Sequence, residues 1–398
     1  MEKSIKKLIV ALFVLYLASA ISNSIMSVIQ TNVIRDYNLV SIQQSYMDLA
    51  TRIGTIAALC SIPFLQSKVK RMFMICFGTA AMIVNMCFIG MSSSFIILLL
   101  ALVLISIGSC FQDSFVNALI IDLSGNESTK YVNTLHMVFG VGAMVNPFII
   151  NRIRDFTGWK STYLVIAVFL FIALMIFMVF SKKTMTHPVM KAQKGLRITK
   201  KDAVLILRDK RNILTALACT FYTSYQMSIA NWIITYLTLE CSIPQDRAVA
   251  ANSFLWIGIV LSRFTIPRIK RDPIKTFVTG SFISAPLCMF GILSGNFYII
   301  CSMTFVCGFL CGHGIPTLIA RAGQNNPGRA VLGISINNLI GSVVGLVWSP
   351  VIASLQGIFN YRIALLVPGL LLLVSAFFGI LLLKACSQFD LEHACNEI

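Results

Sequence analysis

The sequence predicts an all-α membrane protein with twelve transmembrane helices in two similar six-helix bundles. Hydrophobic residues make up 57% of the 398 residues and charged residues only 12%, and the mean hydropathy is +0.83. Such a chain has too little polar surface to fold as a water-soluble protein of this size. Apolar segments of about 20 residues, enough to cross ~30 Å of hydrocarbon as a helix, recur along it. The two halves also share motifs at a nearly constant offset.

Charged or turn-forming residues separate twelve apolar segments. In the first half, spans are predicted at residues 8–34, 42–66, 72–91, 95–121, 131–151 and 161–180. In the second half, they are predicted at 212–239, 247–267, 274–292, 296–320, 330–356 and 361–384. These ranges place the bundles at residues 1–181 and 212–398, joined by a basic cytoplasmic linker at 182–211.

The two halves repeat each other. Gly54 and Pro63 in the second span recur as Gly258 and Pro267 in the eighth, at an offset of 204 residues. The glycine and proline of the fifth span recur in the eleventh at an offset of 203, and the helices lead out to Trp159-Lys160 and Tyr361-Arg362. Two separate matches predict a duplicated six-helix unit. Parallel repeats of six spans joined by a long cytoplasmic segment are typical of rocker transporters, in which the substrate site lies near the membrane midplane between the two halves.

The N-terminal segment could be read as a secretory signal, because lysines precede an apolar run and Ala18-Ser19-Ala20 resembles a cleavage site. Eleven further spans favour an uncleaved first helix. With the N-terminus in the cytoplasm, 24 of the 32 Lys and Arg residues lie in inner segments and six in outer ones. The positive-inside rule therefore predicts a multi-pass protein of the plasma or inner membrane with both termini cytoplasmic. The net charge of +17 indicates topology and attraction to anionic lipid, not nucleic-acid binding.

The fourth and fifth spans carry the candidate transport site. Asp113 and Asn117 share one helix face, and Asn133 and His136 share another with Gly140. A carboxylate within a span costs ~2.5–3.5 kcal/mol on insertion scales, so Asp113 should face a polar partner or a wet cavity. Asp113 is thus the predicted proton-coupling residue, with a purely structural hydrogen bond as the alternative. His136 either contacts a hydroxyl-rich ligand or packs between helices.

Two further sets of in-span residues are candidates. Asp48 and Arg52 are one turn apart, and they either form a buried pair or let Arg52 meet an anionic substrate. His313 falls 200 residues after Asp113 and could be its counterpart. Amide and aromatic side chains suit the hydroxyls and apolar face of a sugar. The remaining substrate-binding candidates are Asn23, Gln30, Gln226, Asn231, Trp232, Asn337 and Asn338.

Nothing in the sequence predicts an enzyme, a metal site or a cofactor. Nearly all of the twelve cysteines lie in apolar runs, where cysteine behaves as a small hydrophobe. They show no metal-ligand spacing. No nucleotide-binding, serine-hydrolase or zinc-protease motif is present.

Across its whole length, the chain resembles the major facilitator superfamily in its twelve spans, its basic central loop and its repeat of six plus six. Within that superfamily, the segment from Gly108 to Pro147 resembles the fucose/glucose proton symporter branch, and so does Phe254-Leu255-Trp256-Ile257-Gly258 with Arg263. The resemblance implies that Asp113 takes up the coupled proton. It also implies that Asn117, Asn133 and His136 line the sugar cavity.

The sequence departs from this pattern at two places. The first span lacks the second acidic residue that the branch often carries, which puts a two-carboxylate mechanism in doubt. The loop after the second span lacks the superfamily's glycine and aspartate and keeps only basic residues. Lys68 and Arg71, together with Arg263, are therefore the candidates for a modified inner gate.

The sequence predicts a monomeric secondary transporter in a lipid bilayer. Its expected cargo is a small polar solute, a sugar in the first place, moved by alternating access coupled to protons or sodium. An organic-anion carrier or drug exporter of the same superfamily is the runner-up, and Arg52 is the residue that favours the anion. A transport-dead sensor or scaffold is the third alternative.

Overall fold

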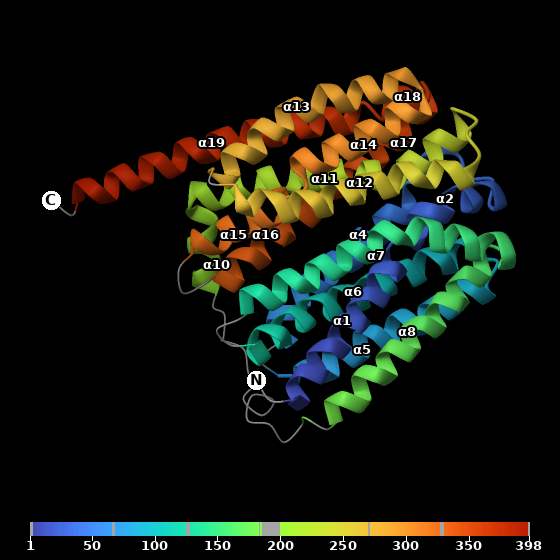
Figure 1. Cartoon of the computed structure of the whole chain (residues 1–398), viewed down its shortest axis with the longest axis horizontal. Coiled ribbons are helices and arrows are strands. Elements are labelled where there is room, and N and C mark those ends of the chain that lie inside the picture. Colours follow the sequence, from blue (N-terminus) through green and yellow to red (C-terminus); the bar gives the residue numbers. More distant parts are fainter. Residues whose placement is uncertain are drawn as a thin grey trace. The chain divides into compact units, whose positions relative to one another are not determined.

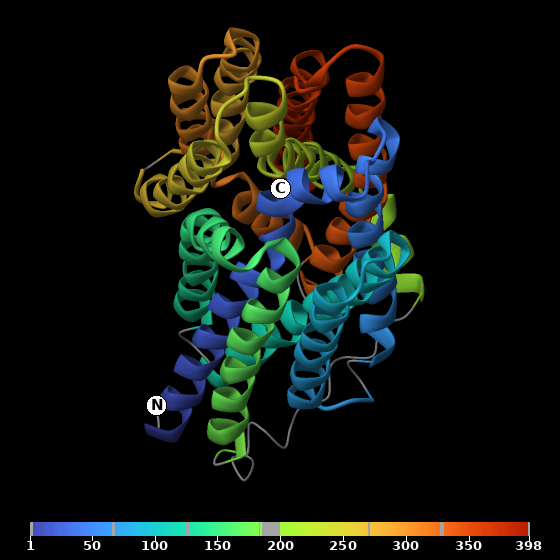
Figure 2. The same cartoon turned by 90° about the vertical axis from the view of Figure 1, so that its right-hand side faces the viewer.

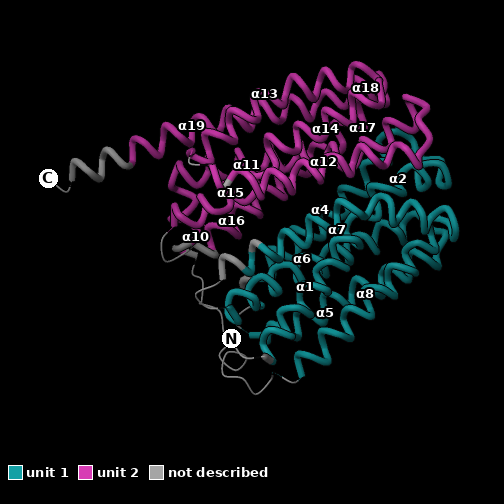
Figure 3. The backbone as a smooth tube through the Cα atoms, viewed as in Figure 1, with its two compact units in different colours: residues 1–197 teal, residues 198–398 magenta. Residues whose placement is uncertain are grey.

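A computed structural model describes residues 3–65, 68–124, 128–182, 184, 200–269, 271–326 and 330–396. The described elements are helices joined by short turns. The chain divides into two compact units, residues 1–197 and 198–398 (Figure 3). In Figures 1 and 2 the long helices of each unit run side by side. Residues 185–199 are outside the described part, so the predicted limits of the linker and the bundles stay a prediction.

Unit 1 contains the first six predicted spans. The first span is divided at Ser24 into α1 (Lys3–Asn23) and α2 (Ile25–Asp36), and the short α3 (Ser41–Gln44) follows. The other five spans are α4 (Tyr46–Leu65), α5 (Arg71–Met91), α6 (Phe95–Ser124), α7 (Ser128–Thr157) and α8 (Trp159–Lys182). Pro147 lies inside α7, which continues through it as one helix.

Unit 2 contains the last six spans, and the last three of them are each divided into shorter helices. A short helix in the predicted linker, α10 (Lys200–Arg208), precedes α11 (Lys210–Leu239), α12 (Gln245–Thr265), η2 (Ile266–Arg268) and α13 (Pro273–Ser294). The tenth span is α14 (Phe297–Cys311) and α15 (Gly314–Gln324). The eleventh is α16 (Ala330–Val344), η3 (Gly345–Val347) and α17 (Trp348–Ile358), and the twelfth is α18 (Tyr361–Ala364) and α19 (Val367–Asn396).

The helical segments account for the predicted spans. Among the described residues, ten segments are long and apolar enough to cross a membrane. The other two predicted spans, 42–66 and 212–239, correspond to α4 and α11, which are 20 and 30 residues long. The protein therefore has the predicted architecture of twelve transmembrane helices in two six-helix bundles.

The two bundles are built on one plan. In each unit the first helix packs on the fifth and the last, the second packs on the fourth, and the third packs on the fourth and the last. A Cβ on Gly78 would lie 2.5 Å from the carbonyl oxygen of Gly108, and one on Gly280 would lie 2.4 Å from that of Leu310. The third and fourth helices thus need glycine at the crossing in both units. The two crossings correspond at an offset of 202 residues.

Within each bundle, an acidic residue at the end of the first span bonds to the start of the sixth span. In unit 1, the indole Nε1–H of Trp159 donates to Asp36 Oδ2 at 2.6 Å. In unit 2, the backbone N–H of Tyr361 donates to Glu240 Oε2 at 2.7 Å. Each contact joins the end of the first span to the start of the sixth. The repeated Trp159-Lys160 and Tyr361-Arg362 pairs therefore mark equivalent places in the two bundles.

Candidate functional site

Asp113 lies where three helices of unit 1 meet. Its Oδ1 accepts a hydrogen bond from the hydroxyl of Tyr16 on α1 and another, of 3.1 Å, from Nδ2 of Asn117 on α6. Hydrogen bonds to an ionised carboxylate are about twice as strong as neutral ones. Tyr16 is only 4% exposed, whereas Asp113 is exposed. The carboxylate is therefore held by a buried phenol and remains accessible on its other side.

The aromatic ring of Tyr16 connects Asp113 to α7. It lies edge-on to the imidazole of His136 with the ring centroids 6.1 Å apart, and 5.5 Å from the ring centroid of Phe139. His136 is exposed. The predicted stripes on α6 and α7 thus meet through a residue of α1. The side chain of Asn133, the other predicted residue of the α7 stripe, is outside the described part of the chain.

Tight packing holds α1 against both neighbouring helices. Ser19 Oγ donates to Gln112 Oε1 at 2.5 Å, which joins α1 to α6 one residue from Asp113. On α7, a Cβ at Gly142 would lie only 2.8 Å from Cβ of Ala20, one turn after Tyr16. Glycine is thus required for α7 to approach α1 closely enough for its aromatic side chains to reach Tyr16.

Two polar atoms beside Asp113 have no hydrogen-bond partner among the described residues. They are the Nε2 donor of Gln112 and the Oδ1 acceptor of Asn117, and both are buried. Buried polar atoms of this kind cost free energy unless water or a ligand satisfies them. The cluster formed by Tyr16, Asp113, Asn117 and His136 therefore combines an ionisable acid with neighbouring polar atoms that a ligand or water could still bond to.

Tyr16 is not among the residues predicted from the sequence. In the first span the predicted residues were Asn23 and Gln30, which lie nearer its second half. The available signal was a phenol in the middle of a hydrophobic run, because a buried tyrosine hydroxyl needs a hydrogen-bond partner.

The predicted charge pair and inner-gate residues of unit 1 lie on α4 and α5. Arg52 is half-buried, and its charge interacts with that of Asp48 one turn earlier. Arg71 forms an ion pair with Asp122 of α6 and donates to the carbonyl of Ala118 at 2.9 Å. Lys68 is exposed in the turn before α5. Asp122, at the end of its span, was not predicted as the partner of Arg71.

His313 and Arg263 hold the break in the tenth span. His313 is 2% exposed, and its Nδ1 lies 3.2 Å from Ser262 Oγ on α12. Arg263 Nε donates to the carbonyl of Gly312 at 3.2 Å. At the offset of 202 given by the glycine crossings, the residue equivalent to Asp113 is Ile315, and His313 corresponds to the buried Phe111.

The other predicted substrate-binding residues differ in exposure. In unit 1, Gln30 is buried and Asn23 is exposed at the end of α1. In unit 2, Gln226, Trp232 and Asn337 are buried, Asn231 is half-buried and Asn338 is exposed. The Oε1 of Gln226 and the Oδ1 of Asn337 have no hydrogen-bond partner among the described residues. Their helices, α11 and α16, are the equivalents of α1 and α7.

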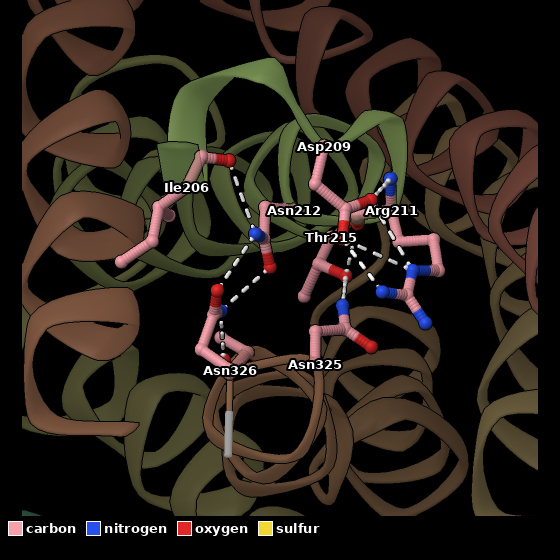
Figure 4. A network of polar contacts seen from close by, with 8 residues as sticks. Ile206, Asp209, Arg211, Asn212, Thr215, Asn325 and Asn326 are labelled. Atoms are coloured by element: carbon pink, nitrogen blue, oxygen red, sulfur yellow. Dashed lines mark hydrogen bonds and ion pairs between the residues drawn. The ribbon is translucent and has the colours of Figure 1, made fainter. Parts of the chain in front are cut away.

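A second polar network, which the sequence did not predict, lies in unit 2 (Figure 4). Asn212 Nδ2 donates to Asn326 Oδ1 at 3.0 Å, and Asn326 Nδ2 donates back to Asn212 Oδ1 at 2.8 Å. Asn212 also donates to the carbonyl of Ile206 at 3.0 Å. The network joins α10, the start of α11 and the end of α15, so its evident role is to fix these segments.

An ion pair stands next to this network. Asp209 caps α11 by accepting from the backbone N–H of Arg211 at 2.8 Å, and its Oδ2 lies 2.7 Å from Arg211 Nη2. Burial of Asp209 acts to raise its pKa, but the hydrogen bonds and the charge of Arg211 outweigh burial and lower the pKa below its ordinary value. Asp209 therefore stays ionised and stabilises the helix start at neutral pH.

Comparison with known proteins identifies the family. Residues 8–290 match the family model described as the Major Facilitator Superfamily. The chain belongs to the major facilitator superfamily. The fold is also similar to crystal structures of a bacterial homolog of the human lysosomal transporter Spinster. The inward-facing, unoccupied structure gives a TM-score of 0.75 at 14% identity, covering 97% of this chain and 98% of that one. The inward-facing, occupied structure gives 0.73 at 14% identity with the same coverage. No curated protein matches the sequence.

Membership of the major facilitator superfamily makes the chain a multi-pass membrane transporter. A small-molecule substrate and a location in the lipid bilayer follow from that family, whose members are typically carriers and not enzymes. The likeness to the Spinster homolog supports the fold alone. The fucose/glucose symporter branch, the solute and the coupling ion stay predictions.

Proposed function

We propose that the protein is a secondary active transporter that moves a small polar solute, first of all a sugar, together with protons. The observation that carries this proposal is the cluster at Asp113. An acid on α6 accepts hydrogen bonds from Tyr16 of α1 and from Asn117 of its own helix. Tyr16 in turn contacts His136 of α7. One proton on Asp113 would therefore change contacts on three helices of one bundle.

The chemistry follows from the donors and acceptors present. An ionised Asp113 accepts from Tyr16 and Asn117, whereas a protonated Asp113 becomes a donor and no longer attracts both strongly. The hydrogen bond from the Tyr16 hydroxyl to Asp113 is then weaker. A solute with several hydroxyl groups could donate to the Oδ1 of Asn117, which has no partner among the described residues, and bond to the exposed imidazole of His136. Proton uptake and solute binding are thereby coupled through shared hydrogen bonds.

Transport measurements on the Asp113→Asn variant test the coupling. Purified protein in liposomes is given an inward proton gradient and a panel of labelled hexoses, and the accumulated solute is measured. We expect Asp113→Asn to lose accumulation against a gradient while retaining solute exchange between the two sides, because the amide cannot carry the proton. Asp246→Asn, which neutralises an exposed acid at the start of α12, is the matched control and should accumulate solute like the parent.

Each result has a definite meaning. Accumulation by Asp113→Asn equal to that of the parent would contradict the coupling role. An acid-dependent signal with organic acids but none with hexoses would overturn the sugar assignment alone. In that case the half-buried Arg52 of α4 is the candidate contact for the anion. Failure of the parent to move any solute of the panel under any ion gradient would favour a sensor or scaffold.

A further inference from the structure

A surface groove on unit 1 lies apart from the Asp113 cluster. It has a volume of about 290 Å³ and runs between α1 and α8. Its apolar lining consists of Val10, Ala11 and Val14 of α1 with Ile176 and Phe180 of α8. At one end, Lys6 and Lys7 complete the lining. The groove thus has a long apolar floor and a positively charged end.

Among the described residues, no acidic side chain lies at this end of the groove. Lys6 and Lys7 are both exposed, α1 has no acidic residue in its first turn, and the described lining of the groove contains no acidic residue. Lys182, two residues after Phe180 at the end of α8, is also exposed and adds a third cation. An occupant must therefore be apolar along most of its length and anionic at one end.

We propose that this groove binds one anionic phospholipid of the surrounding bilayer. Its phosphate lies against Lys6 and Lys7, and one acyl chain lies along Val10, Val14, Ile176 and Phe180. The occupant is an amphiphile because α1 and α8 span the membrane, so their outer faces are in contact with lipid. Lysine ammonium groups near the headgroup layer attract anionic lipid. The apolar side chains of the groove contact one acyl chain and hold it in place, unlike the mobile acyl chains of the surrounding bilayer. This inference does not depend on the transported solute.

Native mass spectrometry tests the proposal on the full chain. The protein is exposed to equal amounts of diacyl phosphatidylglycerol and phosphatidylcholine, and the retained lipids are counted. We expect the parent to retain phosphatidylglycerol preferentially. The double variant Lys6→Gln with Lys7→Gln should lower the ratio of phosphatidylglycerol to phosphatidylcholine by roughly tenfold. The control, Lys68→Gln with Lys70→Gln, removes the same charge from two exposed lysines before α5 and should leave the ratio within about twofold.

A groove-filling variant separates a lipid in the groove from charge attraction alone. Val14 is 38% exposed, so Val14→Trp fills the groove without disturbing the buried side of α1. It should lower retention of both lipids while both lysines remain. Val10→Trp, at a position that is 59% exposed, provides a second such variant. An unchanged ratio in the Lys6/Lys7 variant, an equal loss in the Lys68/Lys70 control, or full retention in both tryptophan variants would overturn the proposal.

Discussion

At the scale of single residues, Tyr16 carries the most information about the site. Its hydroxyl bonds to Asp113 of α6 and its ring contacts His136 and Phe139 of α7. The ring is part of the packing between helices, and the hydroxyl is part of the polar cluster. These two roles can be separated, because phenylalanine keeps the ring and removes only the hydroxyl.

Tyr16→Phe should therefore affect coupling and leave the fold intact. Loss of a hydrogen bond to a charged group is worth about 1.5–3 kcal/mol, enough to lower proton-driven accumulation roughly tenfold or more. Accumulation and exchange are measured in liposomes, with the apparent melting temperature as the check on folding. Phe139→Leu, which changes only ring packing beside Tyr16, is the control for a purely steric effect. Normal accumulation in Tyr16→Phe would remove the phenol from the mechanism.

Prediction from sequence at this scale depended on how unusual each residue is in a membrane. Asp113 was identifiable because a carboxylate within a span needs a partner. Tyr16 was not singled out, because a phenol within a hydrophobic run does not show which helix carries its partner, and only the packing of α1 on α6 and α7 shows it. The pairing of Arg71 with Asp122 was missed for a similar reason, since both lie at the ends of spans. His313 was identified as polar, but its register in the repeat needed the glycine crossings.

At the scale of helices, the contact between Asp36 and Trp159 ties the first span of unit 1 to the sixth. The Trp159 ring also lies 6.1 Å from that of Tyr37, and the ammonium of Lys160 lies 5.5 Å from the Trp159 ring centroid. The indole N–H bond to a carboxylate is the directional part of this contact. Its contribution to stability can be measured because unit 2 contains a tryptophan whose Nε1 has no partner among the described residues, Trp348.

We expect Trp159→Phe to destabilise the protein more than Trp348→Phe does. Both changes shorten a ring that packs against one aromatic neighbour, Tyr37 or Phe221. Only the first removes a charge-assisted hydrogen bond, so the difference should be about 1.5–3 kcal/mol. That corresponds to a few degrees in apparent melting temperature in detergent. Equal shifts in the two variants would mean that the hydrogen bond contributes nothing.

The existence of the helices followed from hydrophobicity, but their interruptions did not. All twelve predicted spans have helical counterparts, because length and apolar composition determine which segments cross a membrane. The breaks at Ser24, at Gly312 and His313, at Gly345 to Val347, and at Leu365 and Leu366 were not predicted. Pro147, by contrast, interrupts no helix, because α7 runs through it. A break depends on which neighbouring helix satisfies the freed backbone groups, and a single sequence does not contain that information.

At the scale of the whole molecule, the even number of spans determines where the ends of the chain lie. Twelve crossings place both termini on the same side of the membrane, and the distribution of Lys and Arg predicts that this side is the cytoplasm. Reporter peptides at the two termini, probed with an impermeant protease on intact cells, test the prediction. We expect both to be protected until the membrane is permeabilised, because the positive-inside rule predicts that both lie in the cytoplasm.

The control for that measurement is the same peptide inserted at Asn38, in the turn between α2 and α3. This turn follows the first crossing and should be cleaved on intact cells. Cleavage at one terminus only would require an odd number of crossings and contradict the twelve-span architecture. Cleavage at both termini with protection at Asn38 would keep the architecture and reverse its orientation.

The places where the two bundles are interrupted differ although their helix pairings agree. Among the described residues, unit 1 divides its first span at Ser24, whereas unit 2 keeps the equivalent α11 continuous and divides its fourth, fifth and sixth spans. Sharp bends in helices occur where the regular i→i−4 pattern of hydrogen bonds is interrupted. The duplicated halves would therefore bend at different places, the first bundle within its first span and the second bundle within its last three spans. Two halves with the same helix pairings would therefore bend in different ways.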